Sequence, residues 1–211
     1  VDTGVDRRHP ELTDNIVYSR NLVDDDQASF DSDEHGTAVA GVIASAADND
    51  LGIVGVAPDV QLMIFKACRQ EKVSRRTSCD SLSIIEALSD VLVQQPDILN
   101  LSLSGPRDAI IERLLREIYR DGIVVLAAVD ESRGLAGSFP ANMEEVIAVG
   151  TAINLGGGFA NVPLAPGTDM LTTAPGATYG FKSGSSIATA YVSGIVALMK
   201  ERNPALSNAD V

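Results

Sequence analysis

The fold is decided by residues 97–129, which read DILNLSLSGPRDAIIERLLREIYRDGIVVLAAV. Two apolar runs, Asp97–Leu103 and Ile123–Val129, flank a segment whose apolar residues recur at helical spacing, Ala109–Tyr119. Gly122 ends that helix before the second run begins. A strand, a helix and another strand in this order are typical of a parallel sheet. Strands that are apolar throughout indicate that helices cover the sheet on both faces.

The same pattern extends to both sides of this unit. Further apolar strands are expected at Val60–Ala67 and Glu145–Gly150, and a helix is expected at Leu82–Gln94. Two helices rich in small residues are expected through Ala38–Ala47 and Ala188–Glu201, and we expect both to be central because small side chains allow close packing. The sequence therefore predicts an α/β fold with a mostly parallel sheet and right-handed crossovers.

Composition limits the possible functions. The chain has 211 residues, of which 45% are hydrophobic, enough for one sizeable core. Its net charge of −13 argues against nucleic acid and anionic membranes as partners. It contains no apolar run of the roughly 20 residues that span a bilayer and no targeting signal. Because it opens without Met at Val1-Asp2-Thr3-Gly4, we expect a fragment of a longer protein.

The two cysteines, Cys68 and Cys79, flank a polar, basic stretch that is typical of a surface loop, Arg69–Ser78. A disulfide closing this loop is one interpretation, if the protein is exported. Two unpaired thiols are the other. The spacing is not that of a zinc site or a redox C-x-x-C pair.

Three segments carry candidate chemistry. Asp2 comes at the end of an expected strand, the edge at which parallel sheets place ligands. His35 begins one small-residue helix and is the natural general base near neutral pH. Ser186 begins another, where free amides and the helix dipole would stabilise an oxyanion. Each residue alone has an ordinary explanation: a turn-stabilising Asp, a structural His and a helix-capping Ser.

Together, the residues follow the chain order Asp, His, Ser, which is the order of subtilisin. The segments Asp2–Asp6, His35–Gly41 and Gly184–Ala188 resemble the three active-site signatures of the subtilases. The resemblance covers nearly the whole chain. Further segments with counterparts in that family are Gly52–Pro58, Asn100–Gly105, Phe139–Ala141, Val146–Gly150 and Ala165–Gly167.

This resemblance implies that residues 1–211 are a subtilase catalytic domain, truncated at both ends, with a subtilisin-like three-layer doubly wound fold. It implies a serine endopeptidase that acts through an acyl-enzyme intermediate, with Asp2, His35 and Ser186 as the triad and no cofactor for the chemistry. A secreted or periplasmic protein, with a pro-segment outside this chain, is also implied. A protein or peptide substrate would lie extended along the cleft. The residues implied to bind it are Ser102, Leu103, Ser104, Gly105, Ala127 and Ala128.

The main departure from the family concerns the oxyanion hole. Subtilases usually place an Asn there, but alignment puts Glu131 at that position, and a one-residue shift puts Asp130 there. An ionised carboxylate cannot donate a hydrogen bond, and losing such a donor typically costs about 10²–10³ in turnover. A protonated acid could donate, but only with a raised pKa. The alternative function is therefore a catalytically impaired subtilase-fold binding or regulatory module.

A second alternative is an aspartic protease built on Asp2-Thr3-Gly4. It would require an all-β chain and a second catalytic Asp, which the helical periods contradict.

The resemblance also implies a possible structural calcium site. Its ligands would be Glu11, Asn49 and the carbonyl groups of Leu51 and Ile53, together with a ligand from an N-terminal segment. A second acidic cluster is a weaker candidate, because it lacks the regular spacing of an EF-hand and a solvated loop explains it better. Its members are Asp24, Asp25, Asp26, Asp31, Asp33 and Glu34.

Overall fold

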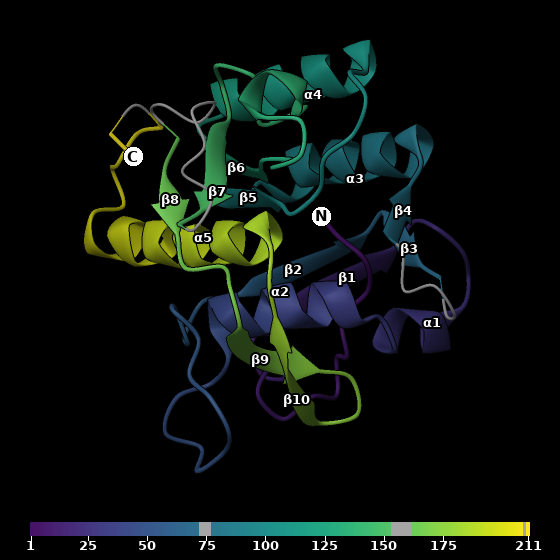
Figure 1. Ribbon diagram of the computed structural model, residues 1–211, viewed down its shortest axis with the longest axis vertical. Coiled ribbons are helices and arrows are strands. Elements are labelled where there is room, and N and C mark those ends of the chain that lie inside the picture. The colour runs from purple at the N-terminus through teal and green to yellow at the C-terminus, as the bar shows by residue number, and fades with distance from the viewer. Residues whose placement is uncertain (72–76, 153–161, 209) are drawn as a thin grey trace.

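The computed structural model describes residues 1–71, 77–152, 162–208 and 210–211. Parallel strands form a central layer between two layers of helices (Figure 1). Helices α3 (Ser81–Gln94) and α4 (Ala109–Arg120) pack together on one face. Helices α2 (Glu34–Ala44) and α5 (Ser185–Arg202) pack together on the other. The prediction of a three-layer α/β fold is confirmed.

Four strands form the main sheet, all parallel to their neighbours. Leu99 lies opposite Val125, and Ala127 lies opposite Ala148. The helix of the central strand–helix–strand unit thus crosses over between adjacent parallel strands, as its sequence predicts. In spatial order the strands are β5 (Ile98–Leu101), β6 (Val124–Ala128), β7 (Ile147–Thr151) and β8 (Leu164–Ala165).

Strand β6 shows why its sequence is apolar without alternation. Val124 and Leu126 belong to the cluster formed with α5, whereas Val125 and Ala127 belong to the cluster formed with α3 and α4. Successive side chains of a strand point to opposite faces, so both faces of β6 are buried. Every residue of this strand is buried.

Two further strands, β1 (Ile16–Asn21) and β2 (Leu62–Lys66), pair in parallel. The first residues of the chain lie between this pair and the main sheet. The Asp2 amide donates to Phe65 O at 3.1 Å, and the Val1 amine donates to Asn100 O at 3.0 Å. A largely apolar cavity of about 270 Å³ lies beside Val1, between β2 and β5. These contacts place Asp2 at the carboxyl ends of the strands.

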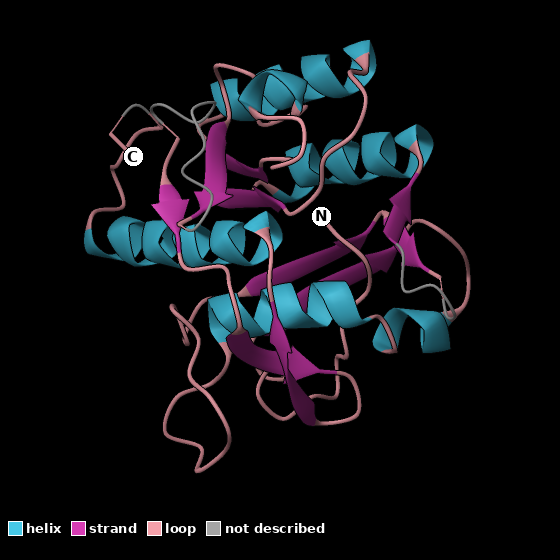
Figure 2. Ribbon diagram, in the orientation of Figure 1, coloured by secondary structure: helices cyan, strands magenta, loops and turns pink. Residues whose placement is uncertain are grey.

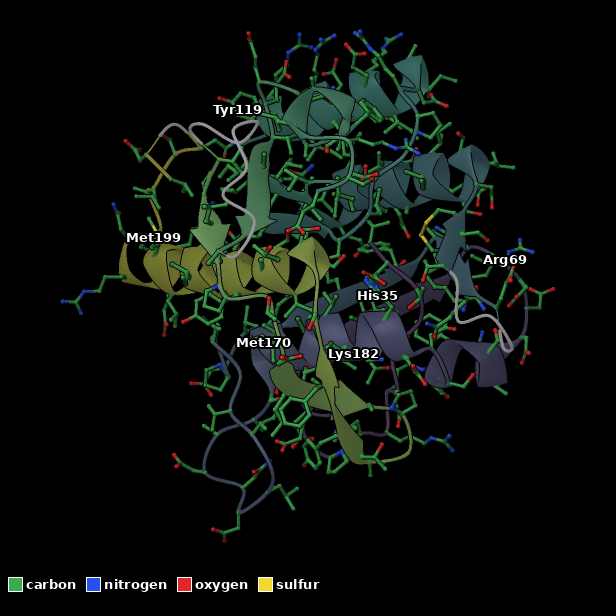
Figure 3. All side chains as sticks on the ribbon, in the orientation of Figure 1. His35, Arg69, Tyr119, Met170, Lys182 and Met199 are labelled. Atoms are coloured by element: carbon green, nitrogen blue, oxygen red, sulfur yellow. A yellow bond between two sulfur atoms is a disulfide. The ribbon has the colours of Figure 1, made fainter. Side chains whose placement is uncertain are left out.

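The stretch between the cysteines is a hairpin and not simply a loop. Strand β3 (Cys68–Gln70) pairs with β4 (Thr77–Cys79), and Cys68 and Cys79 form a disulfide. The bond is drawn in yellow in Figure 3. The remainder of that stretch, residues 72–76, lies outside the described residues. Of the two interpretations left open by the sequence, the structure shows the disulfide.

A second hairpin was not predicted from the sequence. Its strands, β9 (Met170–Ala174) and β10 (Thr178–Lys182), are antiparallel and pack against α2 (Figure 2). Two short helices complete the described elements, α1 (Gln27–Asp31) and a 3₁₀ turn at Leu135–Gly137. No helix in the described part of the chain is long and apolar enough to cross a membrane.

Candidate active site

Asp2 and His35 are in direct contact. The distance from His35 Nδ1 to Asp2 Oδ1 is 2.7 Å, and the same oxygen accepts the Thr3 amide at 2.6 Å. Asp2 is buried, whereas 28% of the His35 side chain is exposed. A histidine whose Nδ1 hydrogen is held by a carboxylate presents Nε2 as a proton acceptor. The Asp2 contact therefore engages Nδ1 of His35 and leaves Nε2 as the ring nitrogen that can accept a proton.

The start of α2 is held against the loop that follows Asp2. The Gly36 amide donates to Thr3 Oγ1 at 2.9 Å, and the Asp6 amide donates to Thr37 Oγ1 at 3.0 Å. Residue 36 must be glycine because a Cβ there would collide with the carbonyl oxygens of Thr3 and Gly4. This close approach brings His35 to Asp2.

Charged neighbours set the protonation of His35. The negative charge of Asp2 raises the pKa of His35 above its usual value, and their hydrogen bond adds to this effect. Burial and the positive charge of Lys182 act in the opposite direction. Lys182 comes from β10 and pairs with Glu34 at 3.1 Å, and Figure 3 labels it with His35. Lys182 was not predicted as a site residue, because its hairpin lacks a buried apolar period that would mark it in the sequence.

Ser186 is the second residue of α5. The next residue, Ile187, belongs to one buried cluster with Ala38 and Val42, which joins the start of α5 to the side of α2. The Ser186 hydroxyl donates to Ser102 O at 3.2 Å. Within the described residues it makes no hydrogen bond to His35. The structure thus forms the Asp–His contact of the expected triad, while the serine hydroxyl points to a main-chain carbonyl.

A cavity of about 360 Å³ opens beside Ser186. Four of the residues predicted to bind substrate line it: Ser102, Leu103, Ser104 and Ala128. Two others lie elsewhere. Gly105 forms a bridge with Phe139, and Ala127 is fully buried in the core beneath α3 and α4. Alternate residues of β6 point to opposite faces, so Ala127 and Ala128 cannot both reach this cavity.

Asp130 and Glu131 also line this cavity, but their carboxylates have other partners. Asp130 Oδ1 accepts from the amide and hydroxyl of Ser132, and Oδ2 lies 3.2 Å from Arg133 Nε. The hydrogen bonds from Ser132 are the main cause of a lowered Asp130 pKa. Glu131 Oε1 accepts from the amide and hydroxyl of Thr151. Asp130 is therefore ionised at neutral pH and is not a hydrogen-bond donor.

The expected calcium ligands form a hydrogen-bonded cluster instead. Glu11 is fully buried, and its oxygens accept from Asn49 Nδ2 at 2.9 Å, the Ile53 amide at 3.1 Å and the Tyr179 hydroxyl at 2.7 Å. Asn49 Oδ1 accepts the Leu51 amide at 3.0 Å. Calcium requires oxygen lone pairs, whereas N–H and O–H groups face this carboxylate. The residues as arranged do not fit a calcium ion.

The second acidic cluster is dispersed. Asp24 and Asp26 bond within their own loop, and Asp31 pairs with Arg7 at 2.6 Å. Asp33 is buried, which corrects the interpretation of this whole cluster as a solvated loop. Among the described residues, no group of three or more His, Cys, Asp or Glu side chains is arranged to hold a metal ion.

Comparisons with known proteins bear on the family and the fold of the chain. The model of the subtilase family matches residues 1–211. The chain is 36% identical to the intracellular serine protease of Paenibacillus polymyxa and 36% identical to the major intracellular serine protease of Bacillus subtilis, with 95% of the chain aligned in both cases. It spans 65% and 66% of the length of these relatives. A psychrophilic protease of known structure superposes over the whole chain, and over 78% of its own length, with a TM-score of 0.84 at 24% identity.

The names of the two intracellular relatives contradict one expectation. Secretion or export to the periplasm was implied by the family as a whole, and similarity to proteins named as intracellular overturns it. The fold, the Asp2–His35 contact and the family match over the full chain support one assignment. The chain belongs to the subtilase family.

Proposed function

We propose that this chain is the catalytic part of a serine endopeptidase, with Asp2, His35 and Ser186 as its triad. The observation that carries the proposal is the 2.7 Å contact between His35 and Asp2, in a chain that also has a serine at the start of α5. The relatives named as serine proteases support the same class of activity. Because the chain spans only part of their length, the activity of the whole protein belongs to the proposal.

The proposed mechanism uses the hydroxyl of Ser186, the imidazole of His35 and the carboxylate of Asp2. Ser186 Oγ attacks the scissile carbonyl carbon while His35 Nε2 takes the hydroxyl proton. Collapse of the tetrahedral intermediate breaks the C–N bond, and His35 returns the proton to the leaving amine. Water then hydrolyses the acyl-enzyme by the same route. The contact with Asp2 orients His35 and stabilises the imidazolium that forms in both steps.

The substrate is proposed to be a protein or peptide in extended form, bound along Ser102–Gly105. Its first three residues, Ser102–Ser104, follow β5 and line the cavity beside Ser186, whereas Gly105 at its end pairs with Phe139. An added strand gains main-chain hydrogen bonds independently of side-chain identity. The side chain before the cleaved bond would enter the cavity between Leu103 and Ala128.

A catalytically impaired binding or regulatory module remains the alternative function. Two observations favour it: the carboxylate of Asp130 is ionised, and the Ser186 hydroxyl donates to a main-chain carbonyl. An ionised carboxylate near the developing oxyanion would oppose the negative charge of the tetrahedral intermediate. Such a module would bind peptides in the same cleft without turning them over.

We also propose a cytoplasmic location, from the names of the intracellular relatives. Disulfides are rare in the cytosol of mesophiles, and the bond between Cys68 and Cys79 would be an exception. Cell fractionation of the native host tests the location directly. Recovery of the protein in the culture medium or the periplasm would contradict it.

The deciding experiment is labelling with a fluorophosphonate probe of activated serines, on the longest expressible form. We expect labelling of the wild type and of Ser185→Ala, and none of Ser186→Ala. Ser185 is the matched control because it lies one residue away and its hydroxyl is held by Val129 O at 2.7 Å. Failure of the folded wild type to react would overturn the catalytic proposal in favour of the binding module.

A further inference from the structure

A buried ion pair lies next to the candidate catalytic residues and has no part in the mechanism above. Lys66, at the end of β2, is 1% exposed, and Asp33, just before α2, is 5% exposed. Lys66 Nζ contacts Asp33 Oδ2 directly. Lysine is almost never fully buried unless paired, and removing two charges from water costs several kcal/mol per ion. A pair at such a position needs an explanation beyond stability.

The pair connects the two segments that carry Asp2 and His35. The main chain of Lys66 forms a parallel bridge with Asp2. Asp33 Oδ2 also accepts the Gly4 amide at 2.8 Å, in the loop directly after Asp2. On the other side, Asp33 precedes the first turn of α2, and its carbonyl accepts the Thr37 hydroxyl at 2.6 Å. One carboxylate thus joins the strand, the Asp2 loop and the helix of His35.

Comparison with other helix starts shows that Asp33 is used differently. Asp26, Asp80 and Asp108 occupy the same capping position at α1, α3 and α4, and each accepts a hydrogen bond from the first amides of its own helix. This is the usual role of Asp at a helix start. Among the described contacts, the Asp33 side chain makes no such bond. It turns instead to Lys66 and Gly4, so the cap of α2 is replaced by long-range contacts.

We propose that Lys66 and Asp33 are positioning residues that hold His35 against Asp2 and keep the charge around His35 balanced. This inference rests on the proposed protease function. The charged groups around His35 are Asp2, on the strand end, Glu34, on its own helix, and Lys182, on β10. Lys66 balances Asp33, so that the helix start adds no further net charge to this set.

Single variants of the pair should move the pKa of His35 in opposite directions. Lys66→Met leaves a buried, unpaired carboxylate two residues from His35 and should raise its pKa. Asp33→Asn removes the direct partner of the buried Lys66 ammonium, of which Asp24 remains a charged neighbour, and should lower the pKa of His35. We expect kcat to fall about 10²-fold in both variants, with KM nearly unchanged, because the catalytic groups are displaced. The acid limb of the pH profile of kcat/KM should follow the pKa of His35.

The double variant Lys66→Met/Asp33→Asn removes both charges and leaves neither partner unpaired. Its asparagine carbonyl can still accept the Gly4 amide. We expect the acid limb of the pH profile to return close to its wild-type position. We also expect kcat of the double variant to be at least tenfold higher than kcat of either single variant. Arg107→Met is the matched control, because it breaks another carboxylate ion pair, with Glu112, which keeps Arg116 as a partner. Arg107→Met should change neither kcat nor the position of the acid limb.

Titration of the histidine resonances by NMR separates this inference from the proposed function. The chain has two histidines, so the signal of His9 serves as an internal reference. Opposite shifts of the His35 pKa in the two single variants would support charge balancing even if Ser186 fails to react with the probe. If both variants lower only the melting temperature, and the His35 pKa and kcat stay at wild-type values, the pair is structural and the inference is wrong. If one single variant fails to fold, the other and the double variant carry the same test.

Discussion

The two sides of the candidate active site differ in how their polar groups are satisfied. On the Asp2–His35 side, a carboxylate meets the imidazole directly, and buried contacts tie the helix to the Asp2 loop. On the Ser186 side, the hydroxyl donates to the carbonyl of Ser102, and the nearby carboxylate of Asp130 is ionised. In the proposed mechanism, the base is therefore oriented for proton transfer, whereas the proposed oxyanion position lacks the side-chain donor that is usual in the family. We therefore expect the Ser186 side to limit turnover.

The largest expected effect tests the Asp2–His35 side. Asp2→Asn should lower kcat by about 10⁴-fold, because an amide at this position favours the wrong tautomer of His35. Hydrolysis of a chromogenic peptide measures it, with the exposed Asp14→Asn as the control for loss of one negative charge. A loss of less than tenfold would show that Asp2 does not orient the base.

On the Ser186 side we expect a smaller effect, which is an increase in kcat. Asp130→Asn should raise kcat by about 10²-fold, since a neutral amide can donate to the oxyanion and no longer repels it. Glu131→Gln is the matched comparison and should change kcat far less, because Glu131 is held by the buried Thr151, whereas the partners of Asp130, Ser132 and Arg133, are exposed. A larger gain in Glu131→Gln than in Asp130→Asn would assign the oxyanion position to Glu131. If kcat rises in neither variant, the Ser186 side does not limit turnover and the contrast between the two sides is wrong.

The cluster of Glu11 with Asn49, Ile53 and Tyr179 resembles the Asp2–His35 side, because hydrogen-bond donors from the protein satisfy its buried carboxylate. Tyr179→Phe should lower the free energy of unfolding by about 1.5–3 kcal/mol, through loss of a hydrogen bond to a charged group. Tyr119→Phe is the control, since its hydroxyl makes no hydrogen bond within the described residues. Denaturant titration measures both.

Chelation tests the same cluster independently. EDTA should leave the melting temperature unchanged, because N–H and O–H groups already occupy the oxygens of Glu11. A lower melting temperature in EDTA, reversed by calcium, would show that the cluster rearranges around an ion.

The elements predicted best are those buried on both faces. The continuous apolar runs around β5, β6 and β7 and the helical periods of α3 and α4 have the expected positions within a few residues. Strand β1 was missed, because IVYSRN is mostly half-buried and carries polar residues. The hairpin of β9 and β10 was missed for the same reason. Its place is set by packing on α2, where the hydroxyls of Thr172 and Thr173 bond to helix carbonyls.

The sequence by itself determined the layered α/β fold and the three candidate catalytic residues. Apolar periodicity follows directly from which faces a strand or helix must bury, and the order Asp, His, Ser is a property of the chain. Only the tertiary structure decided that Asp33 turns to Lys66, that Ser186 donates to Ser102 and that Asp130 is held by Ser132 and Arg133. Two of these contacts join residues 33 and 84 positions apart in the chain. All three depend on how polar groups are satisfied after burial, which local sequence patterns do not specify.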